Sequence, residues 1–260
     1  MDAAGKRMSE AEVRTFTASD GIRLAWREMG SGRPLLLIHG FISDAVTNWI
    51  SYGTAARLAA AGFRCIMPDL RAHGESAKPH DPACYPPDIL ASDQFALLEH
   101  LGIVDFDLAG YSLGARTATR MLALGAVPRR AVLSGMGFEG ITSTGGRSAH
   151  FRHVLRNLGR HERGSPAWMA EAFLKTTGGD PVALDLILET FVDTPPDTLA
   201  TLRMPIAVVC GTEDQDNGSA QRLADALGNA TLIDIPGNHM SAVTKPEFGR
   251  AFVAFLQKGR

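Results

Sequence analysis

The sequence has no marked excess of either charge. Its 26 Lys and Arg residues are nearly balanced by 28 Asp and Glu residues, so the formal net charge is −2. Nucleic acids and anionic membrane surfaces attract proteins mainly through clustered positive charge. The longest basic run in this chain is the pair Arg129-Arg130. We therefore expect neither a nucleic-acid partner nor a membrane partner.

Cysteine is scarce. The chain has three cysteines, Cys65, Cys84 and Cys210, an odd number whose spacings match no metal-binding motif. Cys65 and Cys210 lie in apolar runs, which is typical of small core residues. Free thiols are typical of a reducing compartment. The sequence therefore predicts a cytoplasmic protein without a metal site.

Long apolar segments are also missing. No apolar run approaches the roughly 20 residues that a membrane-spanning helix requires. Residues 1–10 are polar and contain no apolar stretch like that of a secretory signal, so we expect neither export nor membrane anchoring. A chain of 260 residues is long enough for one sizeable α/β domain. Nothing in the sequence indicates the oligomeric state.

Short apolar runs alternate with helix-like stretches along most of the chain. This alternation predicts an α/β fold, in which a mostly parallel sheet is covered on both faces by helices. Two alternating segments joined by Asp20-Gly21 predict an N-terminal hairpin, 13–18 and 22–28. The later strands are expected at 34–38, 64–67, 106–109, 131–133, 206–210 and 231–235. The helices between them are expected at 52–61, 87–101, 113–124, 197–202, 221–227 and 247–257.

The alternation stops between residues 137 and 192. No strand is predicted there, and three helix-like stretches follow one another, at 148–158, 166–175 and 181–190. A loop of this length without structure of its own would be unusual in a compact domain. We therefore predict a core formed by residues 1–136 and 193–260, with a helical insertion at 137–192.

The segment Gly110-Tyr111-Ser112-Leu113-Gly114 lies between a predicted strand and a predicted helix. This is the position of a nucleophile elbow, a sharp turn that lifts a serine hydroxyl above the sheet. Glycines on either side allow neighbouring backbone to pass close by. The helix that follows directs its N-terminus, which favours negative charge, toward the serine. The motif therefore predicts a nucleophilic serine.

With this motif in place, the sequence resembles the α/β-hydrolase superfamily, and the resemblance extends over nearly the whole chain. His39-Gly40-Phe41 follows the buried strand, as in the family. The segment from Asp69 to Ser76 resembles the family's D-x-R-G-x-G-x-S motif, with Ala72 where glycine is usual. The resemblance implies a mostly parallel central sheet and a small helical cap. It also implies an oxyanion hole formed by the backbone N–H groups of Phe41 and Leu113, with His39 and His73 as structural residues.

A nucleophilic serine needs a base, and a third group that orients the base. In open α/β sheets both are expected in loops at the carboxyl ends of strands. His239 follows the last predicted strand and fits the family's chain order of serine, acid and histidine. Asp214, in a G-x-x-D turn, is the expected acid. Asp216 and Glu213 are its rivals, and Glu139 is the candidate if the acid followed an earlier strand.

These residues predict a serine hydrolase that cleaves a small ester or related acyl substrate through an acyl-enzyme, without a cofactor. Carboxylesterase, lactonase, thioesterase, C–C bond hydrolase and perhydrolase reactions use the same three residues and stay open, as does a slow-turnover receptor of the same fold. Aspartate-dependent dehalogenases and epoxide hydrolases are disfavoured because the elbow holds Ser112. The insertion's histidines, His150, His153 and His161, are expected at the surface. Pocket residues are expected among the large side chains Tyr111, Phe138, Phe151, Trp168, Met169, Phe173, Phe191 and Met240.

Overall fold

The computed structural model describes residues 11–258. Its centre is an eight-stranded sheet with the order β1-β2-β4-β3-β5-β6-β7-β8. The strands from β3 to β8 are parallel, whereas β2 is antiparallel to β4 and β1 is antiparallel to β2. The predicted fold class is therefore confirmed. The prediction that residues 1–10 contain no secretory signal lies outside the described residues.

Each predicted strand is present within about two residues of its expected ends. The strands are β1 (Arg14–Thr17), β2 (Arg23–Met29), β3 (Arg33–Ile38), β4 (Phe63–Pro68), β5 (Asp107–Tyr111), β6 (Ala131–Ser134), β7 (Ile206–Gly211) and β8 (Ala230–Ile235). The core helices are α1 (Thr54–Ala60), α2 (Ile89–His100), α3 (Leu113–Ala123), α8 (Pro196–Leu199), α9 (Ala220–Ala226) and α10 (Pro246–Leu256).

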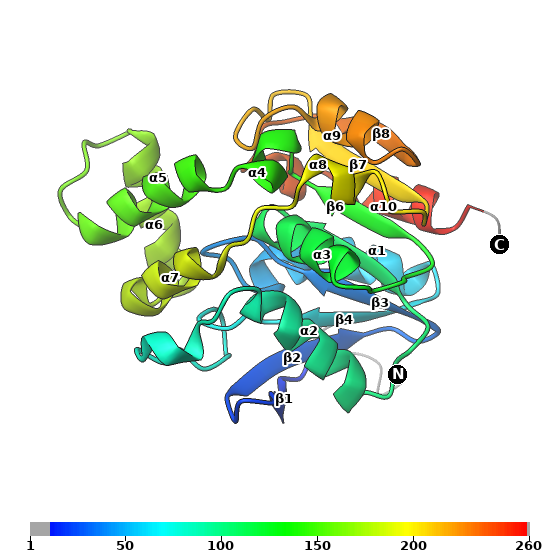
Figure 1. Cartoon of the computed structure of the whole chain (residues 1–260), viewed down its shortest axis with the longest axis horizontal. Helices are drawn as coiled ribbons and strands as arrows, with labels where there is room; N and C mark the ends of the chain where they lie inside the picture. Colours follow the sequence, from blue (N-terminus) through cyan, green and yellow to red (C-terminus); the bar gives the residue numbers. More distant parts are fainter. Residues whose placement is uncertain (1–10, 259–260) are drawn as a thin grey trace, which may run out of the picture.

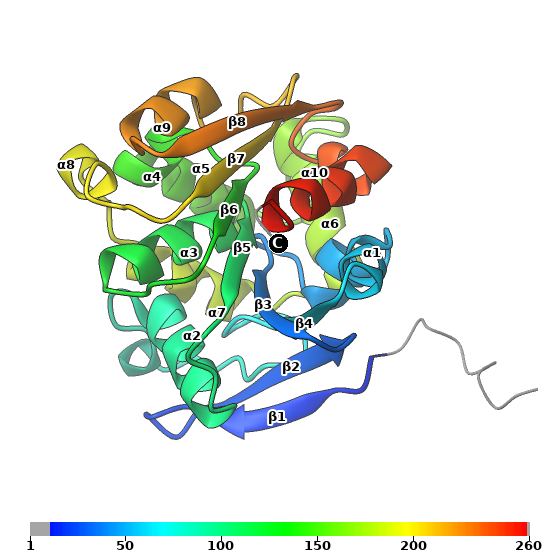
Figure 2. The same cartoon turned by 90° about the vertical axis from the view of Figure 1, so that its right-hand side faces the viewer.

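Helices cover both faces of the twisted sheet, as Figure 2 shows, with α1 and α10 on one face and α2, α3 and α9 on the other. The strand β3 divides its side chains between two apolar cores, because successive residues of a strand point to opposite faces. Leu35 and Leu37 belong to the core with Trp49 and Phe248, whereas Leu36 belongs to the core on the α3 face. Both faces are therefore buried, which explains the uninterrupted apolar run of this strand.

The helices of residues 137–192 lie between β6 and β7 in the chain. They are α4 (Phe138–Thr142), α5 (Gly145–Arg156), α6 (Pro166–Thr177), α7 (Pro181–Ile187) and the 3₁₀ turn η3 (Leu188–Thr190). Figure 1 shows α5, α6 and α7 beyond one end of the sheet, while α4 remains close to α9. Three of these helices were predicted, and α4 was not. Within residues 11–258, no helix is long and apolar enough to cross a membrane.

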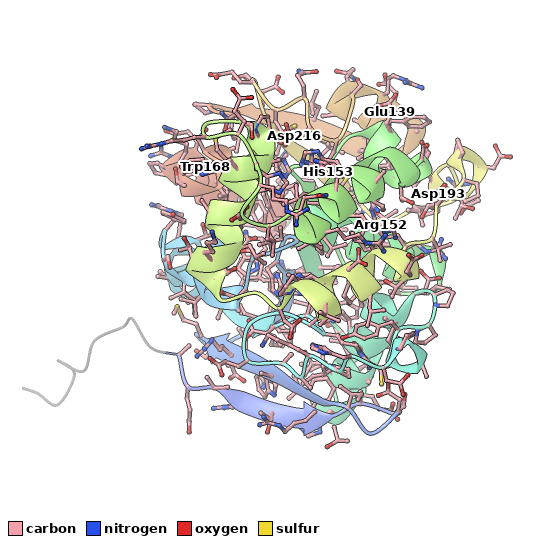
Figure 3. The ribbon with its side chains drawn as sticks, turned by 90° about the vertical axis from the view of Figure 1, so that its left-hand side faces the viewer. Glu139, Arg152, His153, Trp168, Asp193 and Asp216 are labelled. Atoms are coloured by element: carbon pink, nitrogen blue, oxygen red, sulfur yellow. The ribbon has the colours of Figure 1, made fainter. Side chains whose placement is uncertain are left out.

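One histidine of this region differs from its expected position. The side chain of His161 is only 4% exposed and lies beside Glu171, so it is not a surface residue. Its Nε2 atom is 3.0 Å from the Val154 carbonyl oxygen. The ring therefore packs between α5 and α6, because both of its contacts come from these helices. His153 is exposed, as expected (Figure 3).

Candidate active site

Ser112 occupies a strained turn at the carboxyl end of β5. Its φ of 54° and ψ of −115° are rare for a residue with a side chain. The flanking glycines are required by close backbone contacts. A Cβ atom on Gly110 would lie 2.2 Å from the backbone of Gly114, and a Cβ on Gly114 would lie 1.9 Å from the Ile38 carbonyl oxygen. The G-x-S-x-G spacing thus allows β5, α3 and β3 to meet closely enough to form the turn.

The structure brings the predicted serine, histidine and aspartate together. Ser112 Oγ lies 3.0 Å from His239 Nε2, and His239 Nδ1 lies 2.8 Å from Asp214 Oδ2. An ionised carboxylate can only accept a hydrogen bond, so the ring carries its proton on Nδ1 and leaves Nε2 free to accept the serine proton. His239 and Asp214 are 8% and 5% exposed. This arrangement can deprotonate Ser112 and stabilise the imidazolium that results.

Two of the rival acids, Asp216 and Glu139, have other partners. Asp216 forms an ion pair with Arg147 of α5, with a distance of 2.9 Å between Nη2 and Oδ2. Glu139 accepts a hydrogen bond from the Ser219 amide at 2.9 Å and pairs with Arg222. Neither carboxylate is bonded to His239. Of the acids considered from the sequence, Asp214 alone is in contact with that ring.

The loop after β3 lies against the nucleophile. A Cβ atom on Gly40 would lie 3.4 Å from Ser112 Cβ, and the Gly40 amide donates a hydrogen bond to Asn48 Oδ1 at 3.0 Å. The amide of the next residue, Phe41, donates to no other residue within 11–258. Leu113 is the first residue of α3, where the N–H groups have no partner inside the helix. Both predicted oxyanion donors are therefore available near Ser112, and their role stays a prediction.

His39 and His73 are buried beneath this loop. The Leu70 amide donates to His39 Nε2 at 2.9 Å, so His39 Nδ1 carries the proton and donates to the Gly40 carbonyl at 2.8 Å. His73 Nδ1 donates to the Arg71 carbonyl at 2.9 Å. Burial lowers the pKa of both rings, in His73 to about 3, so both are neutral at pH 7. Neither ring is bonded to Ser112, which agrees with structural roles.

The loop that contains His73 also explains a departure from the family pattern. Ala72 has a φ of 68°, in the left-handed region that glycine adopts at little cost. This is the position where relatives usually have glycine. The backbone keeps the conformation because its N–H donates to the Ala77 carbonyl at 3.1 Å. Ala72 therefore adopts a strained conformation in this loop.

Tyr111 does not lie where the pocket prediction placed it. Its ring stacks on the His239 ring with centroids 5.4 Å apart, and it packs edge-on against Phe248 of α10. Its hydroxyl donates to the His239 carbonyl oxygen. Strand alternation is the physical reason, because Tyr111 belongs to the face of β5 opposite the α3 core. Tyr111 therefore supports the base instead of lining a pocket.

The other predicted pocket residues occupy varied positions. Phe138 stacks beneath the Arg222 guanidinium, 4.4 Å from ring to cation, and so packs against α9. Trp168 and Met240 are 38% and 57% exposed, and Figure 3 shows Trp168 on the outer side of α6. Phe151 of α5 contacts the loop after β3, since its ring centroid lies 4.8 Å from that of Phe41. Phe151 thus brings the insertion into contact with the loop that contains Phe41.

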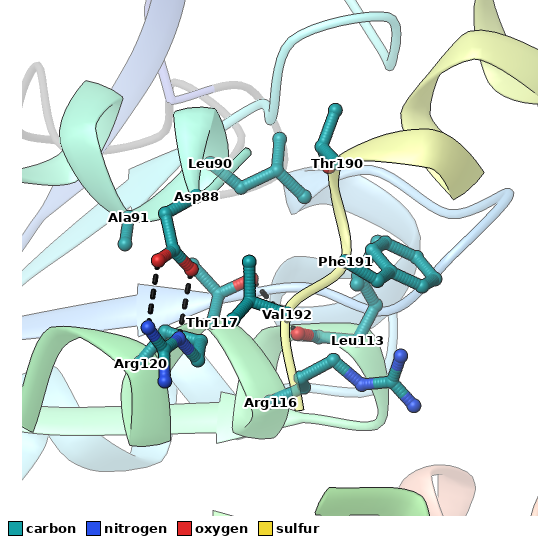
Figure 4. Close-up of a pocket in the computed structure, with 10 residues that line it drawn as sticks. All are labelled: Asp88, Leu90, Ala91, Leu113, Arg116, Thr117, Arg120, Thr190, Phe191 and Val192. Carbon is teal, nitrogen blue, oxygen red and sulfur yellow. Dashed lines mark hydrogen bonds and ion pairs between the residues drawn. The ribbon is translucent and has the colours of Figure 1, made fainter. Parts of the chain in front are cut away.

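A further residue near the site was not identified from the sequence. Arg116, one helical turn after Ser112, is 5% exposed and lines a pocket with Leu113 and Phe191 (Figure 4). In sequence it resembles any charged residue on a solvated helix, so only its place four residues after the nucleophile could have drawn attention to it. Across residues 11–258 there is no group of three or more His, Cys, Asp or Glu side chains arranged to hold a metal ion.

Comparisons with known proteins agree with this architecture. A family model described as the alpha/beta hydrolase fold matches residues 33–135. An epoxide hydrolase from Caballeronia sordidicola is 38% identical over 101 residues, which are 39% of this chain and 30% of the relative. A non-heme haloperoxidase from Rhodococcus erythropolis is 36% identical over 110 residues, which are 41% of this chain and 37% of the relative. The chain thus spans about a third of the length of these curated relatives.

Solved structures extend the likeness to nearly the full chain. A thermophilic esterase from Thermogutta terrifontis aligns with a TM-score of 0.76 and 24% identity, covering 95% of this chain and 99% of that one. At this identity the likeness concerns the fold. With the family model over residues 33–135 and the observed sheet order, it shows that the chain has an α/β-hydrolase fold.

Proposed function

We propose that this protein is a serine hydrolase that cleaves a small ester or related acyl substrate. Ser112 is the nucleophile, His239 the general base and acid, and Asp214 the group that orients the imidazole. The Phe41 and Leu113 amides hold the oxyanion. The partner is a small-molecule acyl compound and no cofactor takes part. A cytoplasmic location stays part of this proposal, in keeping with the three free cysteines.

The proposed reaction has two steps. His239 Nε2 takes the proton of Ser112 Oγ as that oxygen attacks the carbonyl carbon, and the negative charge develops on the carbonyl oxygen between the two amides. The imidazolium returns the proton to the leaving alcohol and an acyl-enzyme remains. Water, deprotonated by the same nitrogen, then attacks the acyl carbon and releases the acid and the free serine.

One observation carries the proposal: the continuous chain from Ser112 Oγ through the His239 ring to Asp214, with contacts of 3.0 and 2.8 Å. A hydroxyl is a weak nucleophile unless a base is placed to remove its proton. The strained turn at Ser112 presents that hydroxyl directly to the base. The relatives named epoxide hydrolase do not redirect the proposal, because the nucleophile position of this chain holds a serine.

The experiment combines covalent labelling with turnover. A fluorophosphonate probe should modify the Ser112 peptide, as read by mass spectrometry, and p-nitrophenyl butyrate should be hydrolysed over many turnovers. Ser112→Ala should abolish labelling and lower kcat by at least about 10³-fold. Ser92→Ala, an exposed serine on α2, is the matched control. Wild-type activity in Ser112→Ala would refute the proposal, and a single slow turnover would favour a receptor instead.

A further inference from the structure

Arg116 combines burial with closeness to the nucleophile. Its amide donates to the Ser112 carbonyl at 3.1 Å, so the two residues are one turn apart on the same side of α3. Side chains of a helix lean toward its N-terminus, which here is the end at Ser112. The guanidinium Nη2 donates to the Gly140 carbonyl of α4 at 2.6 Å. The cation thus lies at the carboxyl end of the sheet, where the site is.

Most of this guanidinium has no partner. Its Nε and Nη1 atoms are buried and form no hydrogen bond with any residue in 11–258. The Asp193 carboxylate attracts it electrostatically, but Asp193 accepts its hydrogen bond from the Thr144 amide at 2.8 Å. Burial lowers the pKa of Arg116 to about 10, so it stays charged at pH 7. A buried cation without a counter-ion is costly to a fold.

The surroundings of Arg116 favour a bound anion over a solvated surface. The Phe191 ring lies 4.6 Å from its guanidinium carbon, a stacking geometry that holds the planar group in place. Figure 4 shows Arg116 and Phe191 on one side of the segment 190–192, whereas Arg120 turns to the other side and pairs with Asp88. Arg120 is an arginine of the same helix with a structural role, because its Nε and Nη2 atoms both donate to the Asp88 carboxylate. Arg116 has no such carboxylate partner among the described residues.

We propose that Arg116 is the binding residue for a carboxylate on the substrate, so that the enzyme prefers acyl compounds carrying a second, negatively charged group. This inference rests on the proposed function of Ser112. The unpaired Nη1 atom would donate a charge-assisted hydrogen bond to a carboxylate oxygen. The Leu113 side chain lines the same pocket, so the charged group would sit beside the oxyanion position and not in open solvent.

The first test measures charge preference with matched esters. One pair is p-nitrophenyl hydrogen glutarate and its methyl ester, which differ by the charge on the acyl side. The other is 3-acetoxybenzoate and its methyl ester, which differ on the alcohol side. The wild type should favour the charged member of at least one pair by about 10-fold or more in kcat/KM, as expected of a charged hydrogen bond. Arg116→Met should lose this preference, because its kcat/KM should fall at least about 10-fold more for the charged ester than for the neutral one.

Controls separate binding from structure. Arg120→Met, which removes an arginine one turn later, should keep the preference. Arg116→Lys keeps the positive charge without the planar guanidinium and should retain part of the preference. It also serves as the test variant if Arg116→Met does not fold. Equal rates for both members of both pairs in the wild type, or equal losses on charged and neutral esters in Arg116→Met, would overturn the inference.

A second readout does not depend on turnover. Glutarate should bind to Ser112→Ala protein in calorimetry, glutaramide should not, and adding Arg116→Met should remove glutarate binding. If no ester is hydrolysed but glutarate still binds through Arg116, the proposed function fails and the carboxylate site stands. If esters are hydrolysed and glutarate does not bind, the site fails and the proposed function stands.

Discussion

At Ser112 the backbone adopts a conformation that most residues avoid, and the structure holds it there from several directions. The Ser112 amide donates to the Ser134 carbonyl at 2.8 Å, and its carbonyl accepts from Arg116. Strain of this kind, about 1–3 kcal/mol, persists only where the surroundings fix it. The hydroxyl is thereby held 3.0 Å from His239 Nε2.

The orientation of the His239 ring gives a prediction at this scale. Asp214→Asn places an amide where the carboxylate accepted the hydrogen bond from Nδ1, which favours the wrong tautomer and leaves the imidazolium unpaired. We expect kcat for p-nitrophenyl butyrate to fall by about 10³- to 10⁴-fold. Asp216→Asn, two residues away and paired with Arg147, should stay within about 3-fold of the wild type. Comparable losses in both variants would contradict the assignment of Asp214.

At the scale of elements, the strands were the most predictable part of the fold. Apolar runs between turn signals predicted inner strands such as β3 and β7, because burial on both faces leaves few polar positions in them. Alternation and the Asp20-Gly21 turn predicted the N-terminal hairpin. The helix α4 was missed because it has five residues, one of them Gly140, and therefore no periodic pattern. The π-helix Val46–Ile50 was missed for a similar reason. Tertiary contacts, not local pattern, form both elements.

The contact between α3 and β3 allows a direct test at this scale. Gly114→Ala would place a methyl group 1.9 Å from the Ile38 carbonyl oxygen, and backbone cannot move aside easily. We expect the free energy of unfolding in urea to fall by about 3 kcal/mol. Gly146→Ala in α5, where a Cβ meets nothing within 4 Å, should be neutral or stabilising. A Gly114→Ala protein as stable as the wild type would show that the elements do not meet this closely.

For the whole molecule, the two buried histidines make stability depend on pH. Unfolded histidine has a pKa of about 6.5, whereas the pKa of folded His73 is about 3 because of burial. Below pH 6.5 the His73 ring binds a proton in the unfolded chain but stays neutral in the folded chain. His73 therefore lowers the free energy of unfolding progressively as the pH falls from 6.5 toward 3. Above pH 6.5 this contribution is constant. The molecule should therefore lose stability in mild acid.

The measurement is urea unfolding between pH 7 and 4. His73→Asn retains a side-chain donor for the Arg71 carbonyl and should reduce the dependence of the unfolding free energy on pH. His153→Asn, which changes an exposed histidine, should reproduce the wild-type dependence. The comparison between variants removes the contributions of all other groups. The same dependence in all three proteins would contradict a buried, neutral His73.

The residues of the candidate site could be predicted from the sequence only where a motif directly follows a predicted strand. Ser112, Asp214 and His239 follow the parallel strands β5, β7 and β8. Sheet topology therefore brings all three residues to the carboxyl end of the sheet. Side-chain direction was not predictable in the same way. Tyr111 points to the opposite core, and the unpaired donors of Arg116 depend on where α4 and Phe191 settle. Side-chain directions of this kind depend on packing between segments that are distant in the sequence.

The hydrogen bond from Tyr111 to the His239 carbonyl ties the base loop to the residue immediately before the nucleophile. The residue immediately after it, Leu113, opens α3 with a free amide. Three neighbours in the chain thus position the Ser112 hydroxyl, the His239 loop and the Leu113 amide around a single bend. A movement that carries these three residues together would leave their mutual spacing largely intact. We therefore expect the proposed chemistry to tolerate movement of the surrounding fold better than a change of spacing within the tripeptide.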